Sequence, residues 1–234
     1  MSSSAEYRPA PRRRVHGHQH LLRVLAPVPR DALRRRLVQL YSGLVLYGLS
    51  VSLLVLSRLG LDPWDVFQQG LARHTGIPIG TWAILVGIGV LGLWVPLRQR
   101  PGLGTLSNAL VIGSVMDLTL ALVPAPPAIS LRVIAMLGGV LLNGVATGCY
   151  IGAGLGPGPR DGLMVGIAAR GHSLRVVRTG IEATVLLSGW LLGGDVGIGT
   201  LVYAASIGPL AHILIPRFTV QCITGVRNVR GPSL

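Results

Sequence analysis

The chain has 234 residues, half of them hydrophobic and only 12% charged, with a mean hydropathy of +0.60. Soluble domains carry about 25% charged residues, so this composition excludes an ordinary soluble domain and favours several passes through a membrane. All 21 basic residues are arginine, and most of them lie in the N-terminal tail or at the ends of apolar segments, which argues against a nucleic-acid-binding protein despite the net charge of +13.

The chain begins with a basic tail, residues 1–36, for which we expect disorder on the cytoplasmic side of the membrane. His16, His18 and His20 alternate in this tail, but a solvated segment is a better interpretation than a metal site. The apolar run that follows is about 20 residues long and has no small-residue cleavage site after it. We therefore expect a first transmembrane helix and not a cleaved signal peptide.

Six apolar segments follow the tail, each close to the length of about 20 residues that a helix needs to cross a bilayer. Helices are the default spanning structure, because lipid offers the backbone no hydrogen-bond partners. The expected spans are residues 37–57, 78–97, 103–123, 131–153, 174–192 and 196–215.

Two shorter segments lie after the first and the fourth of these spans, at residues 63–76 and 159–172. Each begins with proline and has an aspartate two residues later, which are signals of a helix start. We expect two short helices that are re-entrant or lie in the membrane interface. Broken helices at matching positions of two halves point to a transport site.

The two halves of the chain repeat one another, because residues 43–65 match residues 139–161 at an offset of 96. Residues 102–113 match 197–208 at an offset of 95, which one deleted residue explains. Each copy contains three spans, so the second copy must insert upside down relative to the first. The expected fold is all-α, with six transmembrane helices in two inverted three-helix repeats.

The domain organisation follows from this repeat. The first transmembrane repeat covers residues 37–125, the second covers 131–216, and residues 217–234 form a C-terminal cytoplasmic tail. With the N-terminus inside, 18 of the 21 arginines lie in cytoplasmic segments, which is the bias that orients membrane proteins. Both ends of the chain are therefore expected in the cytoplasm.

Asp65 and Asp161 are the first candidate site residues, since they occupy equivalent places in the two halves. A charge within a membrane is costly and by default suggests a function. An equally good interpretation is that each aspartate caps its own short helix. Between proline and aspartate the copies differ: Trp64 is a candidate interfacial anchor, whereas Arg160 either pairs with Asp161 or follows the cytoplasmic arginine bias.

Glu182 is the second candidate, one helical turn beyond Arg178 in the fifth expected span. Residues four apart share a helix face, so the two are expected to form an ion pair. The pair either only allows this span to insert or makes Glu182 a proton or cation site.

Other polar residues occur at matching positions in the spans. Asp117 and His212 lie near span ends and are expected to be interfacial. For the remaining four we expect interhelical hydrogen bonds. They are Tyr47, Asn108, Asn143 and Tyr203.

The stretch from Leu59 to Asp117, with LGLDPWDVFQQGLARHTGIPIGT, resembles the bacterial YczE/YyaS/YitT family of integral membrane proteins. GPRDGLMVGIAAR at 158–170 and GDVGIGTLVYAASIGP at 194–209 resemble the corresponding motifs of its second half. The resemblance implies a multi-pass protein of the bacterial plasma membrane and brings no known site residues with it. Asp62 departs from the family's usual glycine before Pro63; this extra acid could either loosen the turn or bind a cation.

The leading functional hypothesis is a secondary carrier or exporter of a small molecule. A membrane scaffold that acts through a protein partner and a channel are the alternatives. No enzyme is expected, because the chain has no nucleophile elbow, zinc-protease motif or paired Cys-x-x-Cys. No cofactor or metal is expected either; the expected partners are the lipid bilayer and a small molecule or ion, and a homodimer stays open.

Overall fold

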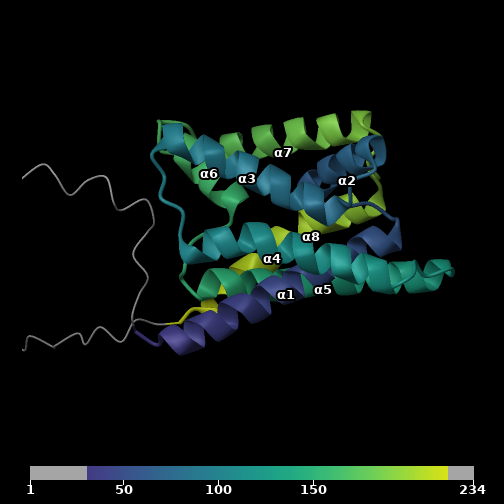
Figure 1. Ribbon diagram of the computed structural model, residues 1–234, viewed down its shortest axis with the longest axis horizontal. Coiled ribbons are helices and arrows are strands. Elements are labelled where there is room, and N and C mark those ends of the chain that lie inside the picture. Colours follow the sequence, from purple (N-terminus) through teal and green to yellow (C-terminus); the bar gives the residue numbers. More distant parts are fainter. Residues whose placement is uncertain (1–30, 221–234) are drawn as a thin grey trace, which may run out of the picture.

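The computed structural model describes residues 31–220, and this part of the chain folds into eight α-helices with no strand (Figure 1). The basic tail with its three histidines, apart from its last six residues, and most of the C-terminal tail lie outside the described residues. In chain order the helices are α1 (Leu33–Ser57), α2 (Pro63–Thr75), α3 (Ile79–Leu97), α4 (Leu103–Leu122), α5 (Ile129–Gly152), α6 (Pro159–Ala168), α7 (Leu174–Leu191) and α8 (Ile198–Phe218).

These helices confirm the all-α class, and the six long ones lie at the positions of the six expected spans. Five of them, α1, α3, α4, α5 and α8, are long and apolar enough to cross a membrane. α7 is not among these five, because its 18 residues include Arg175, Arg178 and Glu182. Whether α7 crosses the bilayer therefore stays a prediction.

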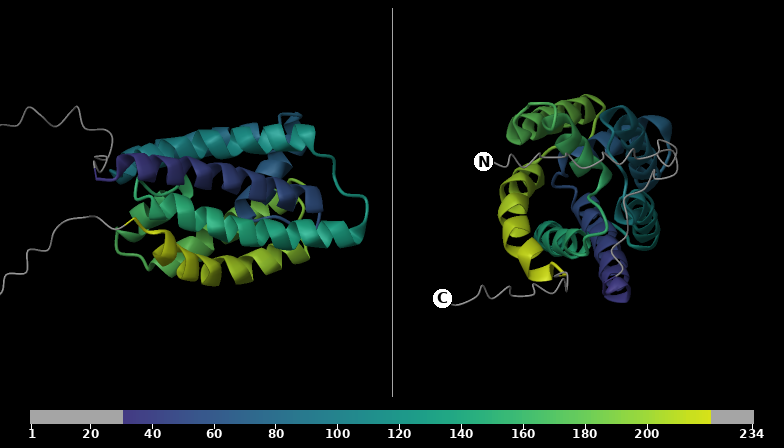
Figure 2. Two further views of the ribbon diagram at one scale, coloured as in Figure 1. Left: turned by 90° about the horizontal axis from the view of Figure 1, so that it is seen from below. Right: turned by 90° about the vertical axis from the view of Figure 1, so that its left-hand side faces the viewer.

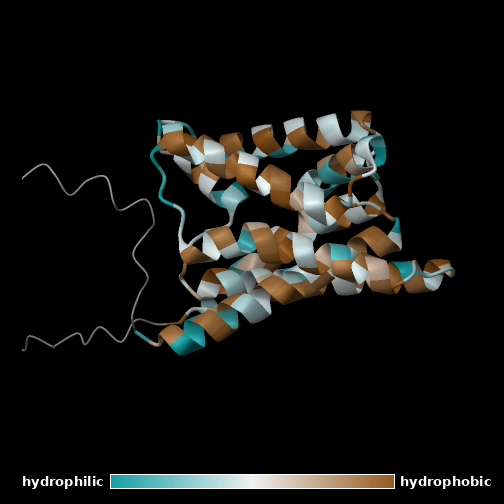
Figure 3. Cartoon of the chain, in the orientation of Figure 1, coloured by the Kyte–Doolittle hydropathy of each residue, from teal (hydrophilic) through white to brown (hydrophobic). Residues whose placement is uncertain are grey.

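Apolar surface covers the outside of the long helices. Val95 is 78% exposed and Leu201 is 71% exposed, as expected for side chains that contact lipid instead of a protein core. Figure 3 shows hydrophobic residues along the length of these helices and hydrophilic residues mainly at their ends and in the loops.

The first helix begins inside the segment that was expected to be a disordered tail. α1 starts at Leu33, and Arg36 is buried. Its guanidinium forms an ion pair with Asp31 at 2.9 Å and donates hydrogen bonds to the carbonyls of Ala153 and Val220. The tail boundary at residue 36 was therefore wrong, and both ends of the described chain lie together.

The eight helices form two layers, which we call the α1 layer and the α2 layer (Figures 1 and 2). In the α1 layer, α1 packs against α4 and α5, and α5 packs against α8. In the α2 layer, α2 and α6 each pack against both α3 and α7. Each layer therefore takes two helices from each half of the chain.

The two layers meet closely on one side only, where α3 packs along α4. The backbone N–H of Gly80 donates to Asp117 at 2.6 Å, and the Thr81 hydroxyl donates to the other carboxylate oxygen at 2.8 Å. Between the described helices α7 and α8 no comparable contact exists. The interior therefore has a closed side at α3 and α4 and a loosely packed side at α7 and α8.

Two glycine turns join the helices in the same way at matching places of the sequence repeat. Gly60 has a φ of +118° and Gly156 has a φ of +121°, a backbone region that favours glycine. The carbonyl before each glycine accepts a 2.8 Å hydrogen bond from the first turn of a long helix, from Gly199 in α8 and from Gly104 in α4. Each half thus holds the start of a helix that belongs to the other half.

Candidate functional site

All six candidate residues come together where the two layers face one another. They line two adjoining cavities, one of about 80 Å³ and one of about 370 Å³. The charged lining of the two cavities consists of Asp62, Asp65, Arg160, Asp161, Arg178 and Glu182. Tyr47, Arg160 and Asp161 line both cavities, so their side chains lie between the two spaces.

Arg160 is the centre of this cluster. From α6 its guanidinium reaches the start of α2, 3.3 Å from Asp62 Oδ2 and 3.4 Å from Asp65 Oδ1. Both carboxylates are buried, with side chains only 4% and 3% exposed. Of the two interpretations of Arg160, pairing with its neighbour Asp161 is therefore wrong; the arginine pairs with acids from the other half of the chain.

A glutamine completes the contacts of this ion cluster. With its amide nitrogen turned toward Asp65, the buried Gln68 donates to Asp65 Oδ1 at 3.0 Å and accepts from Arg160 at 3.0 Å. Gln68 lies one turn after Asp65 on α2, so the helix presents both groups to the same guanidinium. The sequence carried no signal that singled out this residue.

The cap of α2 is Asp62 and not Asp65. Asp62 Oδ1 accepts the backbone N–H of Asp65 at 2.7 Å, and Pro63 occupies the first helical position. Asp65 Oδ2 is buried and has no hydrogen-bond partner in the described part of the chain. The capping interpretation of Asp65 was therefore wrong, although an aspartate directly before a proline is a recognisable cap signal.

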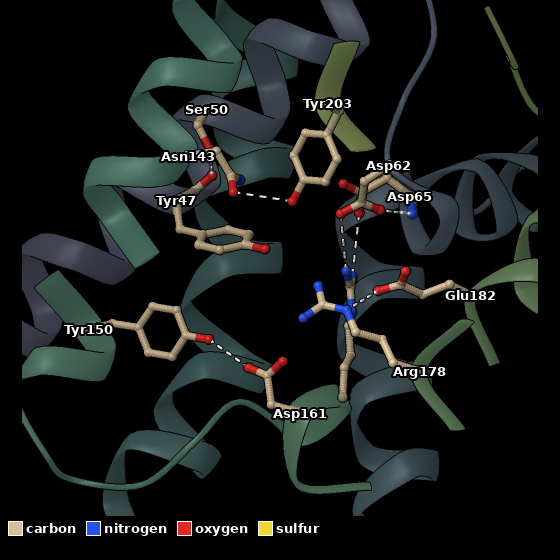
Figure 4. Close-up of polar contacts among 11 residues, drawn as sticks. Tyr47, Ser50, Asp62, Asp65, Asn143, Tyr150, Asp161, Arg178, Glu182 and Tyr203 are labelled. Atoms are coloured by element: carbon tan, nitrogen blue, oxygen red, sulfur yellow. Dashed lines mark hydrogen bonds and ion pairs between the residues drawn. The ribbon is translucent and has the colours of Figure 1, made fainter. Parts of the chain in front are cut away.

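Asp161 does not cap its helix either. The N-cap position of α6 is Gly158, with no side-chain cap, and Asp161 Oδ2 instead accepts a 3.0 Å hydrogen bond from the Tyr150 hydroxyl in α5 (Figure 4). The Tyr150 ring also meets the Tyr47 ring edge to face, with centroids 6.0 Å apart. Sequence reasoning did not identify Tyr150, because its place becomes apparent only when α5 is docked beside α6.

Trp64 is buried inside the protein and does not present its side chain to the surface as an interfacial anchor would. It is only 7% exposed, and it packs in a cluster with Trp94, Leu163 and Met164. The Arg160 guanidinium lies 5.2 Å from the centre of its ring, within the range of a cation–π contact. The anchor interpretation is therefore wrong, and Trp64 belongs to the wall of the larger cavity.

Arg178 and Glu182 form the expected ion pair on α7. Arg178 Nε lies 2.9 Å from Glu182 Oε1, and both side chains are partly exposed, at 53% and 33%. Both line the larger cavity, together with Trp64 and Asp62. The pair is confirmed, and its functional meaning stays a prediction.

Interhelical hydrogen bonds are confirmed for two of the four residues for which they were expected. Asn143 in α5 donates to Ser50 in α1 at 3.0 Å and accepts from the Tyr203 hydroxyl of α8 at 3.2 Å. Asp117 accepts hydrogen bonds from the first turn of α3, and its place at the membrane interface stays a prediction. These contacts hold the helices around the cavities in place (Figure 4).

Matching positions of the sequence repeat line the two cavities. α4 contributes Asn108, Ala109, Ile112 and Gly113 to the smaller cavity, and α8 contributes Tyr203, Ala204, Ile207 and Gly208 to the larger one. Each residue of the second set lies 95 positions after its counterpart in the first. The smaller cavity also borders α3, and the larger one borders α7.

Comparison with known proteins gives relatives without an assigned activity. Residues 34–216 match the family of unknown function DUF6198. The chain is 44% identical to an uncharacterized protein of Haemophilus influenzae over 174 residues, which are 74% of this chain and 80% of the relative. It is 35% identical to the uncharacterized membrane protein YczE of Bacillus subtilis over 180 residues, or 76% and 84% of the two chains.

A third relative is the uncharacterized protein YyaS of Bacillus subtilis. It is 30% identical over 181 residues, which are 74% of this chain and 89% of the relative. No solved structure matches the chain.

Proposed function

The chain belongs to the DUF6198 family and is related to YczE and YyaS of Bacillus subtilis, and we propose a function from its site: a secondary carrier or exporter of a small molecule. Its relatives and its five long apolar helices make it an integral membrane protein. Its proposed location is the bacterial plasma membrane, with six spans and both ends in the cytoplasm.

One observation carries the proposal: repeat-matched residues line two cavities on either side of one buried guanidinium. Many carriers consist of two inverted repeats with the substrate site between them. We propose that the two halves here are related in this way. The turns at Gly60 and Gly156, which make the same contacts at matching places, support this relation.

In this mechanism the α2 layer rocks against the α1 layer. The contact of α3 with α4 borders the smaller cavity, and the loose side between α7 and α8 borders the larger one. By the proposed repeat, these two sides are counterparts. Rocking closes one side as the other opens, so the solute meets Arg160 and Asp161 from alternate faces of the membrane.

A scaffold is less well supported, because it needs no cluster of six charged residues around internal cavities. The capping role that would have explained Asp65 and Asp161 without a solute is also missing. A channel needs a continuous path, whereas Tyr47, Arg160 and Asp161 lie between the two cavities. The carrier is therefore the function that the site supports best.

Side-specific labelling of two matched positions tests the carrier. In a background with Cys149→Ala and Cys222→Ser, Ile112→Cys places a thiol in the smaller cavity and Ile207→Cys places one in the larger cavity. We expect a membrane-impermeant maleimide to label the two thiols from opposite faces of oriented vesicles. Pro127→Cys, in the exposed loop between α4 and α5, reports which face is outside.

The alternatives give other results. A channel allows labelling of each thiol from both faces, and a sealed scaffold allows labelling of neither. Labelling of both thiols from the same face only would contradict alternating access. With a solute in hand, Asp65→Asn and Asp161→Asn should both reduce its flux in vesicles; an unchanged flux in both would remove these acids from the mechanism.

A further inference from the structure

The charges around the two cavities do not balance. Four acids and two arginines line them, as described above. Glu182 pairs with Arg178, so among the described lining residues Arg160 is the cation left for the other three acids; it pairs with Asp62 and Asp65 and not with Asp161. With all groups ionised, these three carboxylates and one guanidinium have an excess of two negative charges. Because unpaired buried charge is costly, the site favours a further positive charge, which either a proton on one of the carboxylates or a bound cation supplies.

Two buried polar atoms beside the cavities have no hydrogen-bond partner among the described residues. They are Oδ2 of Asp65, a residue 2% exposed, and Nε1 of Trp64, a residue 7% exposed. Asp65 lines the smaller cavity and Trp64 lines the larger one. Buried polar atoms without a partner are uncommon in folded proteins. The N–H groups of a cationic ligand could donate to Asp65 Oδ2, whereas Trp64 Nε1 is itself a donor and would gain no partner from such a head group.

Aromatic rings in the lining of the larger cavity also favour binding of a cation. Trp64 already receives the Arg160 guanidinium at 5.2 Å from its ring centre, and Tyr47 and Tyr203 line the same space. An aromatic face attracts a cation through its quadrupole, and this attraction adds to that of nearby carboxylates. Arg160 thus shows, within the chain, how a flat cationic group sits in this site.

We propose that the larger cavity binds a small organic cation with an ammonium or guanidinium head group. Asp161, whose recorded partner is the neutral Tyr150, and Asp62 attract the head group, and Trp64 packs against it. The cation competes with Arg160 for Asp62 and so weakens the ion pair between α6 and α2. This inference rests on the proposed carrier function and names the class of its solute.

Calorimetric titration of the purified full chain in nanodiscs tests the proposal. The probes are ethylammonium chloride and ethylguanidinium chloride, with ethylurea as a neutral isostere and sodium chloride to match the ionic strength. We expect both cations to bind at one site with a dissociation constant in the millimolar range and ethylurea to bind at least ten times more weakly. Equal binding of ethylurea, or no saturable binding of either cation, would overturn the proposal.

Variants locate the binding site. Asp161→Asn keeps an oxygen that accepts the Tyr150 hydrogen bond but removes the charge, so we expect at least a tenfold loss of cation affinity. Asp195→Asn is the matched control, because Asp195 pairs with Arg73 outside both cavities and its variant should bind the cations as the natural chain does. Unchanged affinity in Asp161→Asn would overturn the proposed site.

Two substitutions at a second position test the site in case Asp161→Asn does not fold. Trp64→Phe keeps an aromatic face and should retain most of the cation affinity. Trp64→Leu introduces a side chain close to phenylalanine in volume but without an aromatic face, so the affinity should fall several-fold. Equal affinities in the two variants would contradict the aromatic part of the site. The labelling experiment tests the carrier independently of its solute. Labelling from opposite faces without cation binding would support the carrier and exclude an organic cation as its solute. Cation binding with labelling from one face only would support the cation site and exclude alternating access.

Discussion

One guanidinium, that of Arg160, joins a short helix of the second half to a short helix of the first. Replacing Arg160 by Gln leaves Asp62 and Asp65 buried without their cation. Breaking a buried ion pair in this way costs about 3–5 kcal/mol, so we expect a loss of that order in the free energy of unfolding in detergent. Denaturant titration measures this loss.

The other arginine of the site provides the control. Arg178 is 53% exposed in its side chain, so Arg178→Gln should cost below about 1 kcal/mol. Equal losses of unfolding free energy in the two variants would show that the buried ion pairs of Arg160 stabilise the fold no more than the exposed pair of Arg178 does. The variant that carries both Arg160→Gln and Asp65→Asn should recover part of the lost stability, because it removes one of the unpaired charges.

Asp62 has two roles that substitution separates. Asp62→Asn keeps a side-chain oxygen for the backbone N–H of Asp65 but loses the ion pair with Arg160. Asp62→Ala loses both, and an N-cap is worth about 1 kcal/mol. We therefore expect the alanine variant to unfold more easily than the asparagine variant by about that amount. The same unfolding assay compares them, and identical midpoints would argue against the cap.

The distance along the chain decides which contacts of the site were predictable. Arg178 and Glu182 are four residues apart in one helix, so helical geometry alone predicts their pair. Arg160 lies 98 residues from Asp62 and 95 from Asp65, and no local pattern indicates which acid an arginine will reach. Trp64 was misplaced for the same reason, because its burial depends on residues of α3 and α6 that lie far from it in the chain.

At the scale of elements, hydropathy predicts the helices well. The expected span 103–123 is α4 (Leu103–Leu122), and 78–97 is α3 (Ile79–Leu97). The ends of the first span were less predictable, because arginines before it indicate a cytoplasmic tail whereas Arg36 is held in the fold by backbone carbonyls. The sequence does not show whether a charged side chain forms its hydrogen bonds with protein groups or with water.

The docking of α7 on α2 depends on glycines at the contact, of which Gly70 and Gly189 are two. A Cβ at Gly189 would overlap the backbone of Phe67, whereas a Cβ at Gly180 on the same helix meets nothing within 4 Å. Gly189→Ala should therefore push α7 away from α2 and lower the free energy of unfolding, by about 1–3 kcal/mol as for other overpacked sites. Gly180→Ala should leave it unchanged or slightly raised. Equal effects of the two changes would contradict this contact.

At the scale of the whole molecule, the sequence repeat predicts two three-helix halves but not their interleaving. The structure groups α1 and α4 with α5 and α8, and it places α2 and α3 with α6 and α7. Neither layer is a contiguous stretch of sequence. Such a grouping depends on packing between helices that are far apart in the chain. Hydrophobic periodicity and charge bias are local signals and do not predict which helices pack together.

The six-span topology is tested at α7, the helix in doubt. Alkaline phosphatase is active only outside the cytoplasm, so fusions after Pro127 and after Gly194 should be active and a fusion after His172 should be inactive. The loops at these positions follow α4, α7 and α6. An inactive fusion after Gly194, with an active one after Pro127, would mean that α7 stays on the cytoplasmic side and that the chain has fewer spans.

The interleaved layers have a consequence for biogenesis. When α2 leaves the ribosome, the arginine that neutralises its two acids has not yet been made. At a synthesis rate of about 5–20 residues per second, the gap of 98 residues corresponds to a delay of roughly 5–20 s. During that delay the nascent first half has no finished layer to bury these carboxylates, so α2 must wait at the membrane surface or in the translocon until its counterpart arrives.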